Sequence, residues 1–218
     1  MAFSDELWDS AADVYDAIRA HPFLTGLTDG TLPHGAFGHF VVQDSHYLRG
    51  YARALALLAS RAPTEDDTTL LAQHAAGAIA AEQEMHAALA DALAAETDVH
   101  APVAPTTLAY TSYLLATCHG GSFAEGMGAV LPCYWVYARV GEALLAESSP
   151  DPLYARWIAL YGGEEFQAVV DAAIGLVDRI AGELAPAERA RVIGHYRTTS
   201  RYEWMFWDAA WRRERWPV

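Results

Sequence analysis

The sequence contains no lysine, so all 14 of its Lys and Arg residues are arginines. Without lysine the chain cannot form a Schiff base, anchor pyridoxal phosphate or build a Walker A phosphate-binding loop, since each requires that side chain. Asparagine is also absent, so N-linked glycosylation has no acceptor.

Positive charge is scarce. The chain has 28 acidic and 14 basic residues, for a formal net charge of −14, and no run of basic residues. Such a surface repels nucleic-acid phosphates and anionic membranes. No apolar run of about 18 residues lacks charge, so we expect no membrane span. These patterns predict a protein with neither nucleic-acid nor membrane partners.

Cysteine is nearly absent: Cys118 and Cys133 are the only two. Two cysteines do not form a disulfide framework, and a reducing compartment is the simpler interpretation. The chain opens with acidic residues, Asp5 and Glu6, where a signal peptide would carry basic ones. We therefore expect a cytoplasmic protein.

Alanine makes up about one residue in five, which favours helix. The long segments show helical periodicity, and none shows sustained strand alternation. A length of 218 residues suits one domain. We predict a single all-α domain over 1–218, packed as a bundle. The expected helices span about 4–20, 33–61, 64–96, 106–118, 122–147, 152–184, interrupted or bent at Gly162-Gly163, and 186 to near the C-terminus. A short segment over 23–27 ends at the turn signal Asp29-Gly30.

Asp44 lies where its helix should be buried. Phe37, Phe40 and Tyr51 share one helical face by their spacing, and Asp44 and Tyr47 fall on it. A buried carboxylate costs several kcal/mol unless it is paired or hydrogen-bonded. Asp44 therefore either pairs with a core arginine, caps a neighbouring helix, or points into an aromatic-lined pocket.

Cys133 also lies on an apolar stripe, with Tyr137 one turn later. A cysteine in such a place is usually an inert small hydrophobe. Pro132 favours a functional role instead, because it removes a helical hydrogen bond just before the thiol. Cys118 lies at a helix C-terminus, where the helix dipole disfavours a thiolate, so we expect it to be structural or a tolerated surface thiol.

Glu203 shares a helical face with Trp207 and Trp211. A carboxylate against indole rings is desolvated, which suits a general acid or base. The alternative is a salt bridge from Glu203 to Arg197 or Arg201.

Asp44, Cys133 and Glu203 could converge on one pocket of the bundle. Aromatic walls with a few polar groups are typical of small-molecule sites, and a flat heteroaromatic ligand would stack there. The residue pattern leaves this convergence open. Four tyrosines fall within helices near these faces: Tyr110, Tyr113, Tyr137 and Tyr161.

In their order and spacing, six motifs resemble the TenA family, also called thiaminase II, over nearly the whole chain. They are His21-Pro22-Phe23, Gly30-Thr31-Leu32-Pro33, Phe37 to Tyr47 with Gln43-Asp44, Leu131-Pro132-Cys133-Tyr134-Trp135-Val136-Tyr137, Tyr161-Gly162-Gly163-Glu164-Glu165-Phe166, and Glu203 to Trp211. The resemblance implies a haem-oxygenase-like all-α fold.

The resemblance also implies a reaction. Family members release 4-amino-5-hydroxymethyl-2-methylpyrimidine from thiamine or from the corresponding aminomethylpyrimidine, the latter with loss of ammonia in thiamine salvage. By this resemblance Cys133 is the nucleophile, Glu203 moves protons, and Asp44 binds the aminopyrimidine edge. The expected ring-binding residues are Tyr47, Tyr110, Tyr137 and Tyr161. No metal or organic cofactor is implied, and the expected assembly is a homotetramer.

The sequence departs from the family pattern at Ser45-His46 and at Gly162-Gly163, and either departure would alter the pocket rim. We expect His46 on the exposed face of its helix.

The sequence also allows three other interpretations of function. The same fold hosts di-iron oxidases, for which this chain offers Glu82, Glu84, His86 and Glu142. His21 could bind haem, although a histidine before Pro22 more often caps a helix. A non-catalytic pyrimidine-binding protein is the remaining alternative.

Overall fold

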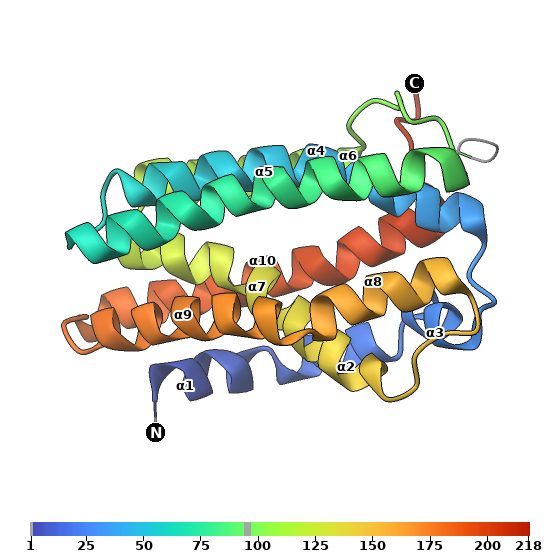
Figure 1. Cartoon of the computed structure of the whole chain (residues 1–218). Coiled ribbons are helices and arrows are strands. Elements are labelled where there is room, and N and C mark those ends of the chain that lie inside the picture. The colour runs from blue at the N-terminus through green and yellow to red at the C-terminus, as the bar shows by residue number, and fades with distance from the viewer. Residues whose placement is uncertain (1, 94–96) are drawn as a thin grey trace. The chain divides into compact units, whose positions relative to one another are not determined.

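The computed structural model describes residues 2–93 and 97–218; the side chains at position 82 and at 84–93 lie outside the described set. Ten α-helices and no strand occur within these ranges, which confirms the all-α prediction. None of the described helices is long and apolar enough to cross a membrane. The helices are α1 Phe3–Ser10, α2 Ala12–Arg19, α3 Pro22–Asp29, α4 His34–Ala59, α5 Glu65–Leu93, α6 Pro105–Gly120, α7 Phe123–Leu145, α8 Pro152–Gly162, α9 Glu164–Ala181 and α10 Pro186–Arg212 (Figure 1).

Local signals set most helix ends. Gly30 ends α3 in the left-handed conformation, with φ of 75°, where glycine is preferred. The Thr64 hydroxyl accepts a hydrogen bond from the Asp67 amide at 3.1 Å, so the predicted cap before α5 forms. Asp151 caps α8 in the same way. Gly163 separates α8 from α9, as the sequence predicts.

The prediction of one continuous helix over 4–20 is wrong, because the chain breaks at Ala11 (φ −121°, ψ 14°) between α1 and α2. Arg197 donates a hydrogen bond to the Ser10 carbonyl, and the Ser10 hydroxyl donates to the Leu7 carbonyl at 2.6 Å. Both bonds compete with the regular helical ladder, so the helix is interrupted where Arg197 engages it.

The chain forms two compact units, each built from separated stretches. The first comprises Met1–Leu32 and Met127–Trp204, and the second comprises Pro33–Gly126 and Met205–Val218. Helices α7 and α10 each begin in one unit and end in the other. The single-domain expectation over 1–218 stays a prediction.

Each unit has its own helix packing (Figure 1). In the first unit α1 packs on α9, α8 contacts α9, and α3 contacts α8. In the second unit α4 lies along both α5 and α6. Gly50 of α4 makes the close approach to α6, since a Cβ there would lie 2.7 Å from the Thr111 methyl group. This packing holds the middle of α4, with Asp44 and Tyr47, beside α6 and Tyr110.

Candidate active site

The two cysteines differ in environment, and neither forms a disulfide. Cys133 lies on α7 directly after Pro132 and is partly exposed. Cys118 on α6 is fully buried, and burial raises the pKa of its thiol to about 12, although the Arg61 charge opposes that shift. Cys118 is therefore a protonated thiol near neutral pH, in agreement with its expected structural role.

An aromatic wall lies beside the same stretch of α7 in the first unit. The rings of Tyr137 and Tyr161 have centroids 5.0 Å apart, and Trp157 lies 4.8 Å from Tyr161. Phe166 meets Tyr161 edge-on at 5.2 Å. Tyr137 follows Cys133 by four residues on α7, so the thiol and this wall belong to one helical face. Such tilted ring clusters offer faces on which a flat heteroaromatic ring can stack.

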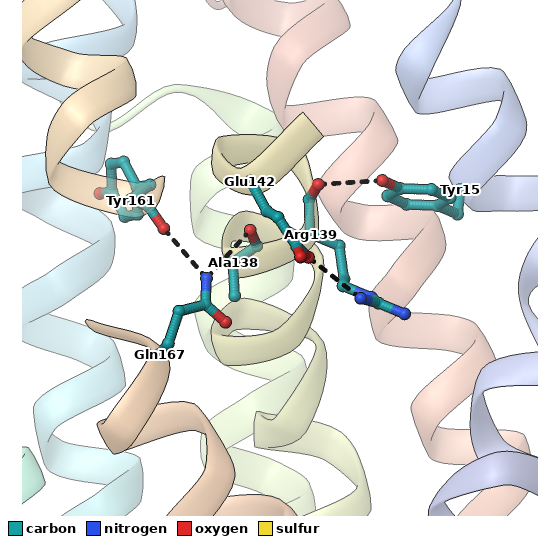
Figure 2. A network of polar contacts seen from close by, with 6 residues as sticks. All are labelled: Tyr15, Ala138, Arg139, Glu142, Tyr161 and Gln167. Atoms are coloured by element: carbon teal, nitrogen blue, oxygen red, sulfur yellow. Dashed lines mark hydrogen bonds and ion pairs between the residues drawn. The ribbon is translucent and has the colours of Figure 1, made fainter. Parts of the chain in front are cut away.

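Gln167 links the Tyr161 end of this wall to α7 by hydrogen bonds (Figure 2). Its side-chain amide donates to the Ala138 carbonyl at 3.3 Å and to the Tyr161 carbonyl at 3.5 Å. One side chain of α9 therefore links the backbones of α7 and α8 where the tyrosines meet.

Two neighbouring residues of α7, Arg139 and Glu142, make polar contacts outside this aromatic wall. The Tyr15 hydroxyl donates to the Arg139 carbonyl at 3.1 Å, and Arg139 pairs with Glu142 at 3.0 Å (Figure 2). This exposed ion pair is of the kind that contributes little stability.

Glu203 lies on α10 with only 1% of its surface exposed. Burial raises the pKa of Tyr196, and the negative charge of Glu203 raises it further. Arg197, one of the two expected salt-bridge partners of Glu203, pairs with Asp13 at 2.7 Å, and Arg201 is exposed. A carboxylate this well shielded from water is placed as a proton-transfer group would need to be.

Asp44, on α4 in the second unit, is 3% exposed, and Tyr47 follows it one turn later. The Tyr47 ring lies 4.9 Å from Tyr110, 5.6 Å from Tyr51 and 5.7 Å from Phe206. Both Tyr47 and Tyr110 are buried. The structure brings the two expected tyrosines, Tyr47 and Tyr110, into contact, and Asp44 is buried on the same helix as Tyr47.

The residues flanking Asp44 hold a loop in place. The Gln43 amide donates to the Pro102 carbonyl at 3.0 Å, and its oxygen accepts from the Ala104 amide at 2.8 Å. The expectation that His46 is exposed is wrong: it is half-buried, with Nε2 3.0 Å from the Ala101 carbonyl. The loop after α5 passes over this part of α4 and covers His46.

The expected site residues fall into two groups. Cys133, Tyr137, Tyr161 and Glu203 lie in the first unit, and Asp44, Tyr47 and Tyr110 lie in the second. Their convergence on one pocket stays a prediction.

The sequence reasoning missed Trp157 and Gln167. Trp157 lies one turn before Tyr161 on α8, a spacing that could have identified it. Nothing in the local sequence marks Gln167, because its role depends on two carbonyls of other helices.

The structure places only some of the residues named for a metal or for haem. Within the described residues, no group of three His, Cys, Asp or Glu side chains is arranged to hold a metal ion. The side chains of Glu82, Glu84 and His86 lie outside the described residues. His21 caps α3, with Nδ1 accepting from the Phe23 amide at 3.1 Å, as expected for a histidine before proline.

Comparison with known proteins gives the family. The chain matches the TENA/THI-4/PQQC family over residues 8–213. It belongs to this family. A protein named aminopyrimidine aminohydrolase, from Bacillus subtilis (strain 168), is 36% identical over 218 residues, which cover 99% of this chain and 92% of that protein.

Solved structures give the fold. A TenA homologue from P. horikoshii OT3 has a TM-score of 0.88 at 29% identity, covering 97% of this chain and 99% of that one. A domain from Shewanella denitrificans OS217, described as having a heme oxygenase-like fold, has a TM-score of 0.73 at 15% identity, covering 96% of this chain and 92% of that one. The expected haem-oxygenase-like fold is confirmed.

Proposed function

We propose that this protein is an aminopyrimidine aminohydrolase of thiamine salvage. It releases 4-amino-5-hydroxymethyl-2-methylpyrimidine from the aminomethylpyrimidine, with ammonia, or from thiamine. The observation that carries this proposal is the 36% identity, over 99% of the chain, to a protein named aminopyrimidine aminohydrolase. The partly exposed Cys133 and the buried Asp44 and Glu203 are consistent with such chemistry.

In the proposed reaction the Cys133 thiolate forms a bond to an electron-poor ring carbon of the pyrimidine. The electron pair moves into the ring, and the C–N bond at the methylene then breaks as the leaving amine takes a proton from Glu203. Water adds to the methylene, giving a proton back to Glu203. The S–C bond breaks and the aromatic ring is restored. The net change is R–CH₂–NH₂ plus H₂O giving R–CH₂–OH plus NH₃.

The other assigned residues bind the ring. A carboxylate accepts hydrogen bonds from an exocyclic amine, which is the role proposed for Asp44. Tyr47, Tyr110, Tyr137 and Tyr161 stack on the pyrimidine or donate to it. Covalent catalysis divides a difficult displacement into two easier steps, and proton transfer to the leaving amine contributes about 10²–10⁴-fold. The proposed reaction needs no metal or organic cofactor.

The proposed setting is a homotetramer in the cytoplasm, with only small-molecule partners. Two cysteines outside any disulfide are consistent with a reducing compartment. The net charge of −14 favours a neutral or cationic substrate over a phosphorylated one.

Mass-spectrometric detection of the hydroxymethylpyrimidine tests the proposal, with purified protein incubated separately with the aminomethylpyrimidine and with thiamine. We expect product from at least one substrate, and the ratio of the two rates gives the preferred leaving group. Folded protein that binds the pyrimidine without forming product would favour a non-catalytic binding protein. Product formation that requires added iron would favour the di-iron alternative.

A further inference from the structure

A cavity of about 300 Å³ lies within the second unit, between the start of α4, the loop after α5 and the chain beyond α10. None of the residues assigned to the proposed active site lines it. Its lining includes His39 of α4, Thr97 of the loop, and Arg213 and Arg215 of the C-terminal tail.

The walls of the cavity are held by specific bonds. The Glu214 carboxylate accepts from the Thr106 amide at 2.8 Å and from its hydroxyl at 3.1 Å, and the Trp216 indole donates to the Val103 carbonyl at 2.9 Å. These contacts tie the C-terminal tail to the start of α6. With the Gln43 bonds to the loop, they fix the cavity before any ligand binds.

Two polar atoms at this site lack hydrogen bonds. His39 Nε2 and Thr97 Oγ1 are buried and have no hydrogen-bond partner among the residues that the structure describes. Such atoms normally find a partner, because leaving one unsatisfied costs about 1–3 kcal/mol. Both belong to residues that line the same cavity, and Thr97 Oγ1 lies against Gly38, so a bound ligand reaches these covered atoms only when the two side chains turn toward it.

Charged side chains of both signs line the cavity. Burial and the charges of Arg215 and Arg213 lower the pKa of His39 to about 4, with Glu214 opposing. The lining carries two arginines, Arg213 and Arg215, and two carboxylates, Asp98 and Glu214. The Glu214 carboxylate is already engaged by Thr106. Asp98 at the exposed rim already accepts from the His100 amide at 3.0 Å.

We propose that this cavity binds the phosphate group of a small phosphate ester. A phosphate monoester carries a charge of about −1.5 to −2 near pH 7, which matches the two arginines better than the single charge of a carboxylate does. Its three terminal oxygens can accept from the two guanidinium groups and from the Thr97 hydroxyl. The neutral His39 ring donates or accepts one further bond according to its tautomer.

Titration calorimetry with inorganic phosphate tests this proposal, in a phosphate-free buffer near pH 7 at constant ionic strength. We expect saturable binding of one phosphate per chain. Arg213→Gln and Arg215→Gln should each weaken it about tenfold or more, since hydrogen bonds to charged groups are worth ~1.5–3 kcal/mol. Thr97→Val should weaken it severalfold. The bonds that anchor the tail come from Glu214 and Trp216, so the arginine variants should fold.

The matched control is Arg212→Gln. Arg212 lies on the last turn of α10, pairs with Asp208 at 2.8 Å and does not line the cavity. Its loss changes the net charge equally and should alter phosphate affinity less than twofold. Histidine ring NMR signals that disappear in His39→Gln should shift on phosphate addition. The proposal would be overturned if phosphate did not bind saturably or if acetate bound with equal affinity. It would also be overturned if Arg212→Gln weakened phosphate binding as much as the cavity variants do.

Discussion

Gly141 of α7 lies directly against the backbone of Tyr161 at the end of α8. A Cβ at position 141 would lie 2.5 Å from the Gly162 amide nitrogen and 2.7 Å from the Tyr161 carbonyl oxygen. Neither atom belongs to a flexible side chain, so the two helices cannot stay in place around a larger residue. This close approach sets where Tyr161 stands beside Tyr137.

Gly141→Ala should therefore destabilise the protein by about 1–3 kcal/mol, the usual range for overpacking a core. Gly175→Ala is the matched control: Gly175 is exposed on α9, with nothing within 4 Å of an added Cβ. That control should stabilise the protein by roughly 0.5–1 kcal/mol, because alanine favours helix. Denaturant unfolding of both variants measures the contrast, and equal effects would contradict the close approach.

Gln167 is a positioning residue for the proposed pyrimidine pocket. Gln167→Met removes both donated bonds at similar side-chain length, so Tyr161 should lose its fixed position. We expect KM for the aminomethylpyrimidine to rise roughly 3- to 10-fold, with kcat changing less, from bonds worth ~0.5–1.5 kcal/mol each. The control is Glu165→Gln, an exposed neighbour on α9. A loss confined to kcat, or an unchanged KM, would refute this role.

Stability should fall as the pH drops from about 6.5 to about 4. The folded protein holds the pKa of His39 at about 4, against 6.5 for an ordinary histidine. In that window the unfolded chain takes up a proton that the folded chain does not, so acid favours unfolding. Above pH 6.5 this contribution to stability is fully present.

His39→Gln should make the unfolding free energy less pH-dependent across this window. Burial also lowers the pKa of His74, so part of the dependence should remain in the variant. His34→Gln, at the exposed start of the same helix, controls for the loss of a histidine. If the unfolding free energy changes with pH equally in the wild type and in His39→Gln, His39 does not contribute to the pH dependence of stability.

Thiol labelling should distinguish the two cysteines. A thiol-specific reagent at pH 8 should modify one thiol of the native protein, Cys133, because Cys118 is fully buried with its pKa raised to about 12. Activity should be lost in step with this labelling, and denaturant should expose the second thiol. Peptide mapping identifies the modified residue. Native labelling of Cys118 first would contradict the burial described above.

Local sequence signals predicted most helix ends, because caps, prolines and glycines act within one turn. The break at Ala11 could not be predicted in this way. It depends on Arg197, which lies 187 residues from Ser10 in the sequence. The covering of His46 likewise depends on Ala101, in a loop without helical periodicity.

The candidate site was also only partly predictable from local sequence. Asp44, Cys133 and Glu203 could be selected because each is polar on an apolar helical stripe. The link made by Gln167 could not, since it requires the positions of the Ala138 and Tyr161 carbonyls. The cavity beside His39 could not be predicted either, because a loop and the C-terminal tail form two of its walls.

Cys133 is the residue proposed to attack the substrate. The most direct measurement is the rate of hydroxymethylpyrimidine formation by Cys133→Ser beside Cys118→Ala, with circular dichroism to confirm that both fold. We expect Cys133→Ser to lower the rate by at least about 100-fold, because a serine hydroxyl is a much weaker nucleophile than a thiolate near neutral pH. Cys118→Ala should retain most of the activity if it folds. Full activity in Cys133→Ser would contradict the nucleophile assignment.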